Sequence, residues 1–372
     1  MTKGRNVSRR NFLVGAIGGA VVLSEERAVS GLATAGQNVS KGKRVTVQTV
    51  LGPIDTAKLG FTQPHEHVCA ASAGFWGAWP DLFGGRAAFI KMTVEKLKKY
   101  KDGGMDSFVD VTTIDLGRDI RLIEEVSRKS GVQIVPCTGH WLDPSRSMNA
   151  RTLEELVDFF THEIQVGIEG TPIKAGVIKV ANDIEGITPF GERLLRAATR
   201  TSKAIGTPIW THTWALDRIG EKQAAIFEQE GISPSKVCIG HSDDTPDVEY
   251  LTGLARRGYY IGMDRLPGGL PRIPGTPPPP PQQVRATLEQ RLASIKHLID
   301  AGFVDRVMLS TDHPIGLGSA ATATWQARDA RNPDGINFVR AKVIPRLKDM
   351  GVQETAIRTM TVENPKRYFD GA

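Results

Sequence analysis

The feature of this sequence that most restricts its fold is a regular alternation of short β-rich runs and amphipathic helical stretches, from about residue 58 to residue 350. Such alternation is typical of βαβ units, whose parallel strands form one sheet. Eight units fit a closed (β/α)8 TIM barrel, an α/β fold, better than an open doubly wound sheet. The predicted strands are Phe61–Val68, Ser107–Thr113, Val132–His140, Ala175–Ala181, Pro208–Thr213, Val237–Ser242, Tyr259–Arg265 and Arg306–His313.

Amphipathic helical patterns fill the intervals between the predicted strands. No glycine-rich dinucleotide-binding motif follows the first strand, and no Walker-type phosphate loop occurs. A chain of 372 residues therefore reads as one barrel domain, residues 36–372, behind an N-terminal leader. The predicted helices include Arg118–Ser130, Thr152–Val166, Gly191–Ile205 and Ile219–Glu230.

One proline-rich stretch, Gly268–Gln283, interrupts the alternation. Consecutive prolines exclude the interior of a helix or strand and favour a stiff, exposed loop in polyproline geometry. The stretch directly follows the seventh predicted strand, on the barrel face where active sites are built. A lid or a pocket wall is therefore the second interpretation.

The first 35 residues are typical of an export signal. Basic residues at positions 3, 5, 9 and 10 precede the apolar run Phe12–Leu23, and Ala33-Thr34-Ala35 offers a cleavage site with small residues. The segment from Ser8 to Leu13 closely resembles the twin-arginine signal, whose cargo crosses the membrane already folded. The apolar run is shorter than the ~20 residues that a membrane span needs. We expect a soluble protein exported to the periplasm or another extracytoplasmic space, with no stable membrane span.

The leader also accounts for half of the net charge. The whole chain carries a formal charge of +6, and the leader contributes five positive and two negative charges, a net of three. The remaining +3 is not the charge of a nucleic-acid-binding surface. Three cysteines are too few for a disulfide framework. By strand alternation we expect Cys137 and Cys238 to be buried and to point away from the face that carries His140 and His241.

Polar side chains that can bind a metal end several of the predicted strands. A barrel gathers the carboxyl ends of its strands around one axis, so these side chains should lie close together. Strand alternation places His65 and His67 on the same face, with Glu66 turned away. A single histidine in an apolar strand is more often a core residue, but the whole set favours a site for divalent cations. The set is His65, His67, Lys179, His212, His241 and Asp312.

Lys179 is the unusual member of this set, since an ammonium group would repel a cation. Burial and neighbouring positive charge lower the pKa of a lysine, and the neutral amine can react with carbon dioxide. The resulting carbamate could bridge two cations. The alternative is a salt bridge from Lys179 to Asp110 or Asp312.

These residues resemble the binuclear metal site of the amidohydrolase superfamily. More closely, the chain resembles the bacterial phosphotriesterases (aryldialkylphosphatases, or organophosphate hydrolases) over roughly residues 45–368. The resemblance implies one cation held by His65, His67 and Asp312, and a second, more exposed cation held by His212 and His241. The matching segments are 61–67, 116–119, 178–180, 238–244 and 332–335.

The same resemblance implies the chemistry. Carboxylated Lys179 and a hydroxide would bridge the two cations, with Zn²⁺ as the first candidate and Co²⁺, Mn²⁺ or Fe²⁺ as alternatives. The hydroxide would attack phosphorus in line, and an aryl or alkoxide leaving group would depart opposite. Asp312 would orient the hydroxide and take its proton. A homodimer is also expected.

Arg265 departs from the phosphotriesterase pattern, in which a histidine commonly passes the proton on to an aspartate, here Asp244. An arginine stays protonated, so it cannot relay a proton. We expect Arg265 to pair with Asp244 or Asp264, or to touch the substrate. Arginine at this position also occurs in phosphotriesterase-like lactonases, which open lactones with the same metal pair.

The residues around the leaving group are the least constrained. Trp141 matches the pocket tryptophan of the phosphotriesterases, with core packing as the alternative, and the long loop after the seventh strand also favours that activity. The expected apolar lining is Leu116, Trp141, Ile315 and Leu317. The sequence thus predicts a binuclear phosphotriester hydrolase; the alternatives are a lactonase with the same site and a metal-binding protein without turnover.

Overall fold

The computed structural model describes residues 45–71, 73–142, 144–268, 280–317 and 330–371. All of them belong to one compact unit, Arg44–Ala372. The leader, residues 1–35, and most of the proline-rich stretch lie outside the described residues. Among the described helices, none combines the length and the apolar character needed to cross a membrane.

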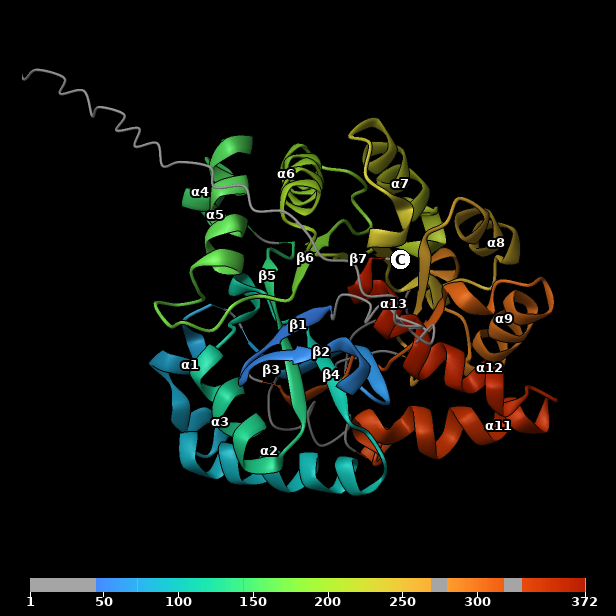
Figure 1. The fold of residues 1–372 in the computed structure, drawn as a ribbon, viewed down its shortest axis with the longest axis horizontal. Coiled ribbons are helices and arrows are strands. Elements are labelled where there is room, and N and C mark those ends of the chain that lie inside the picture. Colours follow the sequence, from blue (N-terminus) through green and yellow to red (C-terminus); the bar gives the residue numbers. More distant parts are fainter. Residues whose placement is uncertain (1–44, 72, 143, 269–279, 318–329, 372) are drawn as a thin grey trace, which may run out of the picture. The chain divides into compact units, whose positions relative to one another are not determined.

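Eight strands form one curved parallel sheet at the centre of the unit (Figure 1). Each overlaps a strand expected from the sequence, which confirms the α/β barrel. Neighbours in sequence are neighbours in the sheet, as in a TIM barrel. The strands are β3 (Thr62–Ala70), β4 (Ser107–Asp110), β5 (Gln133–Gly139), β6 (Val177–Ala181), β7 (Ile209–His212), β8 (Val237–Ile239), β9 (Tyr260–Met263) and β10 (Val307–Leu309).

The sheet closes on itself through a segment that the sequence pattern did not resolve. One long strand was expected over 306–313, but β10 ends at Leu309 and a ninth strand, β11 (Pro314–Leu317), pairs with β3. Between them Asp312 has a left-handed φ of 50°, which interrupts the strand. The backbone N–H of Asp312 donates to the carbonyl of His65 at 3.1 Å, which joins this segment to the first barrel strand.

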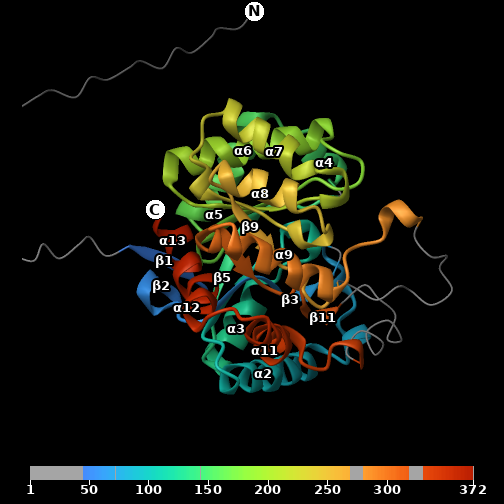
Figure 2. The ribbon, with the colours of Figure 1, turned by 90° about the vertical axis from the view of Figure 1, so that its right-hand side faces the viewer.

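Helices surround the sheet, with α6 and α7 on one side of the view in Figure 2 and α2, α3 and α11 on the other. The four predicted helices are confirmed to within two residues at each end. Local sequence explains their bounds: Thr152 and Glu155 form a capping box at the start of α5, and Thr188 caps α6 just before Pro189. The longer helices are α2 (Arg86–Asp102), α3 (Ile120–Ser130), α5 (Leu153–Gln165), α6 (Pro189–Ile205), α7 (Ile219–Gln229), α8 (Val248–Arg256) and α9 (Leu288–Asp300).

Shorter elements complete the unit. The hairpin β1 (Thr46–Thr49) and β2 (Gly52–Asp55) is antiparallel and precedes the barrel. The C-terminal part contains two π-helical turns, at Val339–Val343 and Thr359–Glu363. The short α-helices are α1 (Phe75–Ala78), α4 (Arg146–Asn149), α11 (Ile344–Asp349), α12 (Glu354–Arg358) and α13 (Asn364–Asp370).

Strand alternation divides the buried apolar residues into two clusters. Phe108, Ile178 and Ile239 belong to the larger cluster, with residues of the helices, whereas their neighbours Val109 and Val177 belong to a smaller one. Neighbouring residues of a strand face opposite sides of a sheet, so the smaller cluster fills the barrel interior. This interior core lies on the face of the sheet that also carries Lys179, two residues beyond Val177.

Cys137 and Cys238 belong to the interior cluster and are fully buried. Their burial confirms the prediction, but the direction was wrong: they share the inner face with Lys179. The prediction assumed that strand alternation extends to His140 and His241, each three residues after a cysteine, so that cysteine and histidine would face opposite sides. His241 has a left-handed φ of 56° and lies beyond the end of β8, so alternation does not extend to it.

Candidate metal centre and the residues around it

The four histidines of the predicted site come together from three strands: His65 and His67 lie within β3, His212 ends β7, and His241 follows β8. All four are nearly or fully buried. The ring centres of His65 and His241 lie 4.8 Å apart, those of His212 and His241 4.4 Å apart, and those of His65 and His67 5.5 Å apart. Residues separated by up to 176 positions in the sequence therefore form a single cluster, as the barrel topology predicts.

Asp264, at the end of β9, fixes two of these imidazoles. One carboxylate oxygen lies 2.7 Å from Nδ1 of His65, and the other lies 2.9 Å from Nδ1 of His241. Asp264 also accepts the backbone N–H of His241, and the indole N–H of Trp210 lies 2.9 Å from Nδ1 of His65 and 3.2 Å from Asp264. A carboxylate only accepts, so Nδ1 of His241 carries a proton, and a neutral His241 keeps its lone pair on Nε2. Such a carboxylate–histidine pair is the usual support of a metal-binding histidine.

Asp312 faces Nε2 of both histidines of β3. Its Oδ1 lies 3.3 Å from Nε2 of His65 and 3.1 Å from Nε2 of His67. His65, His67 and Asp312 thus offer ligand atoms within 4.8 Å of one another, the spacing that a shared metal ion requires. Nδ1 of His67 lies 2.8 Å from the hydroxyl of Thr112, which orients that ring in turn.

His212 differs from His241 in the ring nitrogen that is free to bind a cation: it is Nδ1 and not Nε2. Its Nε2 lies 3.3 Å from a carboxylate oxygen of Asp183, which places the proton on Nε2 and the lone pair on Nδ1. The indole N–H of Trp141 donates to that lone pair at 3.3 Å. Burial lowers the pKa of His212 to about 4, so the ring is neutral and able to bind a cation. Trp141, expected only as pocket lining, therefore contacts a candidate ligand directly.

Lys179 lies buried in the midst of these groups, with Nζ 3.4 Å from Nε2 of His65 and 3.4 Å from the carbonyl of Thr211. Within the described ranges no carboxylate lies within ion-pairing distance of Nζ, so the alternative of a salt bridge to Asp110 or Asp312 is wrong. Burial lowers the pKa of Lys179 to about 8. A buried amine without a carboxylate partner suits conversion to a carbamate, and the donor set fits a pair of cations.

Glu66 points away from the cluster, as strand alternation predicted. The buried carboxylate accepts hydrogen bonds from the Ser310 hydroxyl, from the Thr311 backbone and hydroxyl, and from the His313 backbone. These bonds fasten β3 to the segment that carries Asp312. Burial raises the pKa of Glu66 to about 7. The Glu66 side chain thus helps to close the barrel. It also holds the segment of Asp312 opposite His65 and His67, which lie in the same strand as Glu66.

Arg265 joins Asp312 to a second carboxylate. Its Nε donates to Oδ2 of Asp312 at 2.9 Å, and its Nη1 donates to Oδ2 of Asp244 at 2.8 Å. The expected pairing with Asp244 is confirmed; the partner on the other side is Asp312, and Asp264 instead binds histidines. Although burial opposes charge, Asp244 and Asp312 raise the pKa of Arg265 above its usual value. The guanidinium therefore stays protonated.

The structure does not gather the residues of the predicted apolar lining into one pocket wall among the described residues. Leu116 ends a 3₁₀ turn, Ile114–Leu116, and is partly exposed, whereas Ile315 in β11 is fully buried in the larger core cluster. The side chain of Leu317 lies outside the described residues. The role of these three residues in a substrate pocket stays a prediction.

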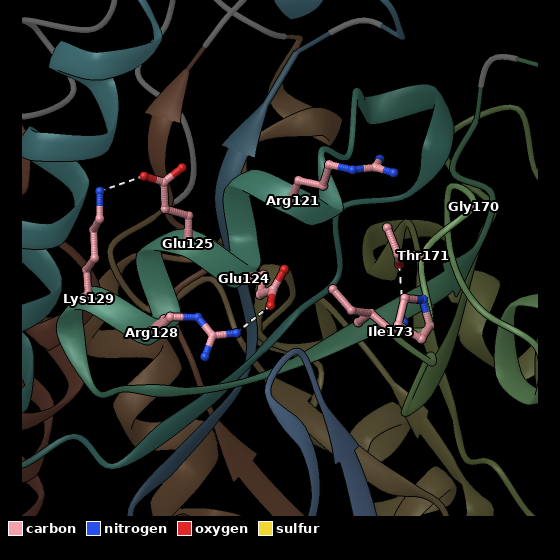
Figure 3. A pocket seen from close by; sticks show the side chains of 9 residues that line it. Arg121, Glu124, Glu125, Arg128, Lys129, Gly170, Thr171 and Ile173 are labelled. Carbon is pink, nitrogen blue, oxygen red and sulfur yellow. Dashed lines mark hydrogen bonds and ion pairs between the residues drawn. The ribbon is translucent and has the colours of Figure 1, made fainter.

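A surface pocket of about 590 Å³ lies away from this centre, between α3 and the segment that leads into β6 (Figure 3). Its charged side chains pair with each other, Arg128 with Glu124 and Lys129 with Glu125, one helical turn apart. None of the predicted site residues lines it. The predicted site residues therefore lie at the candidate metal centre and not at this pocket.

Comparison with known proteins agrees with the geometry. A sequence profile of the Phosphotriesterase family matches residues 45–369. The chain belongs to the phosphotriesterase family. It is 35% identical over 342 residues to a phosphotriesterase homology protein of Mycobacterium tuberculosis (strain CDC 1551 / Oshkosh), covering 87% of this chain and 97% of the relative.

Two further relatives have different names. An aryldialkylphosphatase of Saccharolobus solfataricus is 34% identical over 325 residues, covering 85% of this chain and 96% of the relative. An N-acetyltaurine hydrolase of Danio rerio is 24% identical over 360 residues, covering 88% and 98%. This chain thus belongs to a family of hydrolases, and its structure contains candidate metal ligands.

Sequence reasoning did not identify several residues that contact the candidate ligands. Asp264 ends the seventh predicted strand, next to Arg265, and its position alone could have marked it as a strand-end carboxylate. Asp183 follows the fourth predicted strand at a similar place. Thr112 and Trp210 carried no comparable signal, since threonine and tryptophan are common in buried strands.

Proposed function

We propose that the protein hydrolyses phosphotriesters at a centre for two divalent cations, with Zn²⁺ as the first candidate. His65, His67 and Asp312 would hold one cation, His212 and His241 the other, and a carbamate on Lys179 would serve both. The observation that carries this proposal is the pair of imidazoles held by Asp264, whose Nε2 atoms face Asp312. Nε2 of His65 also faces the buried Lys179, which has no carboxylate within ion-pairing distance in the described part of the chain.

Two bound divalent cations would acidify a shared water and polarise the phosphoryl oxygen. Asp312 would orient that water and accept its proton. Against the effect of burial, His65 and Arg265 hold the pKa of Asp312 well below its usual range, so the carboxylate is ionised. Trp141, beside His212, would place the leaving group on the more exposed side of the centre.

Lactone hydrolysis is the second candidate, and Arg265 is the observation that favours it. A protonated guanidinium between Asp312 and Asp244 cannot pass a proton outward as a histidine would. The relatives named for aryldialkylphosphate and N-acetyltaurine hydrolysis support a wider range of phosphoryl and acyl substrates for this scaffold.

Parallel kinetics on one preparation test the proposal. The kcat/KM values for diethyl p-nitrophenyl phosphate and for an acyl-lactone are compared after loading with zinc. We expect the phosphotriester to be hydrolysed at least as efficiently as the lactone. Efficient lactone opening with phosphotriester turnover close to the uncatalysed rate would assign the centre to lactones instead.

We also propose that residues 1–35 direct export of the folded protein by the twin-arginine route. The paired Arg9 and Arg10 and the short apolar run that follows them support this assignment. Export after folding would allow the metals to be acquired before the protein leaves the cytoplasm.

A further inference from the structure

A second arginine, Arg285, lies at the edge of the same centre. Its Nε lies 2.9 Å from Oδ2 of Asp244, the oxygen that also binds Arg265. Its guanidinium carbon lies 5.0 Å from the ring centre of Trp214, which follows β7. Asp244 and Trp214 follow neighbouring strands at their carboxyl ends, so Arg285 is on the face of the barrel that carries the histidines.

Arg285 has fewer carboxylate contacts than the two arginines beside it. Asp244 is shared by three guanidinium groups: Arg265 and Arg285 contact one oxygen, and Arg291 contacts the other. Arg291 forms a second ion pair, with Asp243 at 2.6 Å. Arg265 also forms a second ion pair, with Asp312 at 2.9 Å. Among the described residues Arg285 contacts only this one carboxylate oxygen within 4.0 Å, whereas Arg265 and Arg291 each contact two carboxylates.

Exposure also distinguishes Arg285 from the other two arginines. Its side chain is 35% exposed, whereas that of Arg265 is 12% exposed and that of Arg291 is buried completely. The contact with Asp244 uses Nε. In the described part of the chain no carboxylate pairs with either Nη group, which leaves the outer part of the planar guanidinium available for an oxyanion.

We propose that Arg285 binds an oxyanion substituent of the substrate, a carboxylate, sulfonate or phosphate group, while the scissile bond lies at the metal centre. This assignment rests on the proposed function, since it takes that centre to be the reacting one. Trp214 and Asp244 position the guanidinium, and the substituent is its second anionic partner. The preferred substrates would be esters, lactones or phosphotriesters that carry one negative charge away from the reacting atom.

Binding of a simple anion tests the subsite without turnover. The zinc-loaded wild-type protein, Arg285→Gln and Arg285→Lys are titrated calorimetrically with benzenesulfonate, a poor metal ligand, and with its neutral analogue methyl phenyl sulfone. Arg257→Gln is the matched control, because Arg257 is 33% exposed, pairs with Glu228 at 2.8 Å and lies 5.6 Å from the ring centre of Tyr259, away from the centre.

We expect Arg285→Gln to weaken binding of benzenesulfonate about tenfold or more, the usual worth of a charge-assisted hydrogen bond. Arg285→Lys should bind with intermediate affinity, and Arg257→Gln should bind as the wild type does. The sulfone should bind equally to all four proteins. Equal affinity of wild type and Arg285→Gln for benzenesulfonate, or no binding to the wild type, would overturn the proposal.

Kinetics with a matched pair of phosphotriesters separate this proposal from the proposed function. The pair is diethyl 4-carboxyphenyl phosphate and its methyl ester, and the quantity compared between proteins is the ratio of their kcat/KM values. Arg285→Gln should lower that ratio about tenfold, since intrinsic reactivity cancels. Failure of the wild type to hydrolyse either ester would contradict the proposed function, while the benzenesulfonate titration would still decide the role of Arg285.

Discussion

The guanidinium Nε of Arg265 donates to Oδ2 of Asp312 at 2.9 Å, on the carboxylate whose other oxygen faces His65 and His67. Arg265 thereby binds the residue expected to accept a proton from the nucleophilic water. Since arginine does not lose its own proton in proteins, it stabilises the carboxylate and does not carry a proton further. The pair distinguishes this centre from one with a histidine relay.

Replacing Arg265 by methionine should lower kcat/KM for the preferred substrate roughly 10- to 100-fold, the usual cost of losing a group that supports a metal ligand. The physical reason is that Asp312 and Asp244 each lose a buried ion-pair partner. Steady-state kinetics check this, with Arg128→Met on the exposed face of α3 as the control. Equal kcat/KM in Arg265→Met and wild type would show that Arg265 takes no part in the reaction.

Asp264→Asn should weaken metal binding by roughly 10- to 100-fold, because an amide cannot accept from His65 and His241 as a carboxylate does. Competition with a chromophoric chelator measures the affinity. Asp300→Asn, which changes an exposed carboxylate on α9, should bind metal as the wild type does. A thermal melt of each variant verifies folding; unchanged metal affinity in a folded Asp264→Asn protein would argue against the supporting role of this carboxylate.

The three cysteines should be unreactive towards Ellman's reagent in the folded protein. All three are buried, and burial raises the pKa of the Cys69 thiol to about 12, so little thiolate is present at neutral pH. Burial likewise raises the pKa values of Cys137 and Cys238. We expect close to no labelling before unfolding and three equivalents in guanidinium chloride. Rapid labelling of the native protein that persists in Cys69→Ser would contradict the interior position of the other two.

Substitution of both Arg9 and Arg10 by lysine should keep the protein in the cytoplasm, since the twin-arginine pathway reads the paired arginines. Fractionation of a bacterial host followed by immunoblotting measures the exported share. The matched control is Lys3→Arg, which keeps the charge of the leader. Undiminished export of the double variant would exclude the twin-arginine route.

Much of the barrel could be predicted because its signal is periodic and repeated. Each β-rich run alternates with a helical pattern, and polar residues such as His65, His212 and His241 interrupt apolar strands at their ends. The topology of a barrel then brings these ends together, whichever residues lie between them. For this reason the convergence of the predicted histidines, Lys179 and Asp312 needed no knowledge of side-chain geometry.

The rest depended on backbone turns and on contacts between distant side chains. Strand alternation fails where a residue takes a left-handed conformation, as His241 and Asp312 do, so the direction of Cys238 and the separate strand β11 were not predicted. Asp264 supports two imidazoles from β3 and β8, and Glu66 binds a segment about 245 residues away. Nothing in the local sequence indicates such pairings.

In the proposed function the candidate centre holds two metal ions and hydrolyses phosphotriesters with them. The most direct measurement is the metal content of the purified protein by mass spectrometry, with paraoxon hydrolysis followed before and after chelation, for wild type and Lys179→Met. We predict two metals per wild-type chain, activity lost on chelation and restored by zinc or cobalt, and loss of both metal and activity in the variant. A folded wild-type protein without stoichiometric metal after supplementation, or a Lys179→Met protein with unchanged metal and activity, would contradict this account.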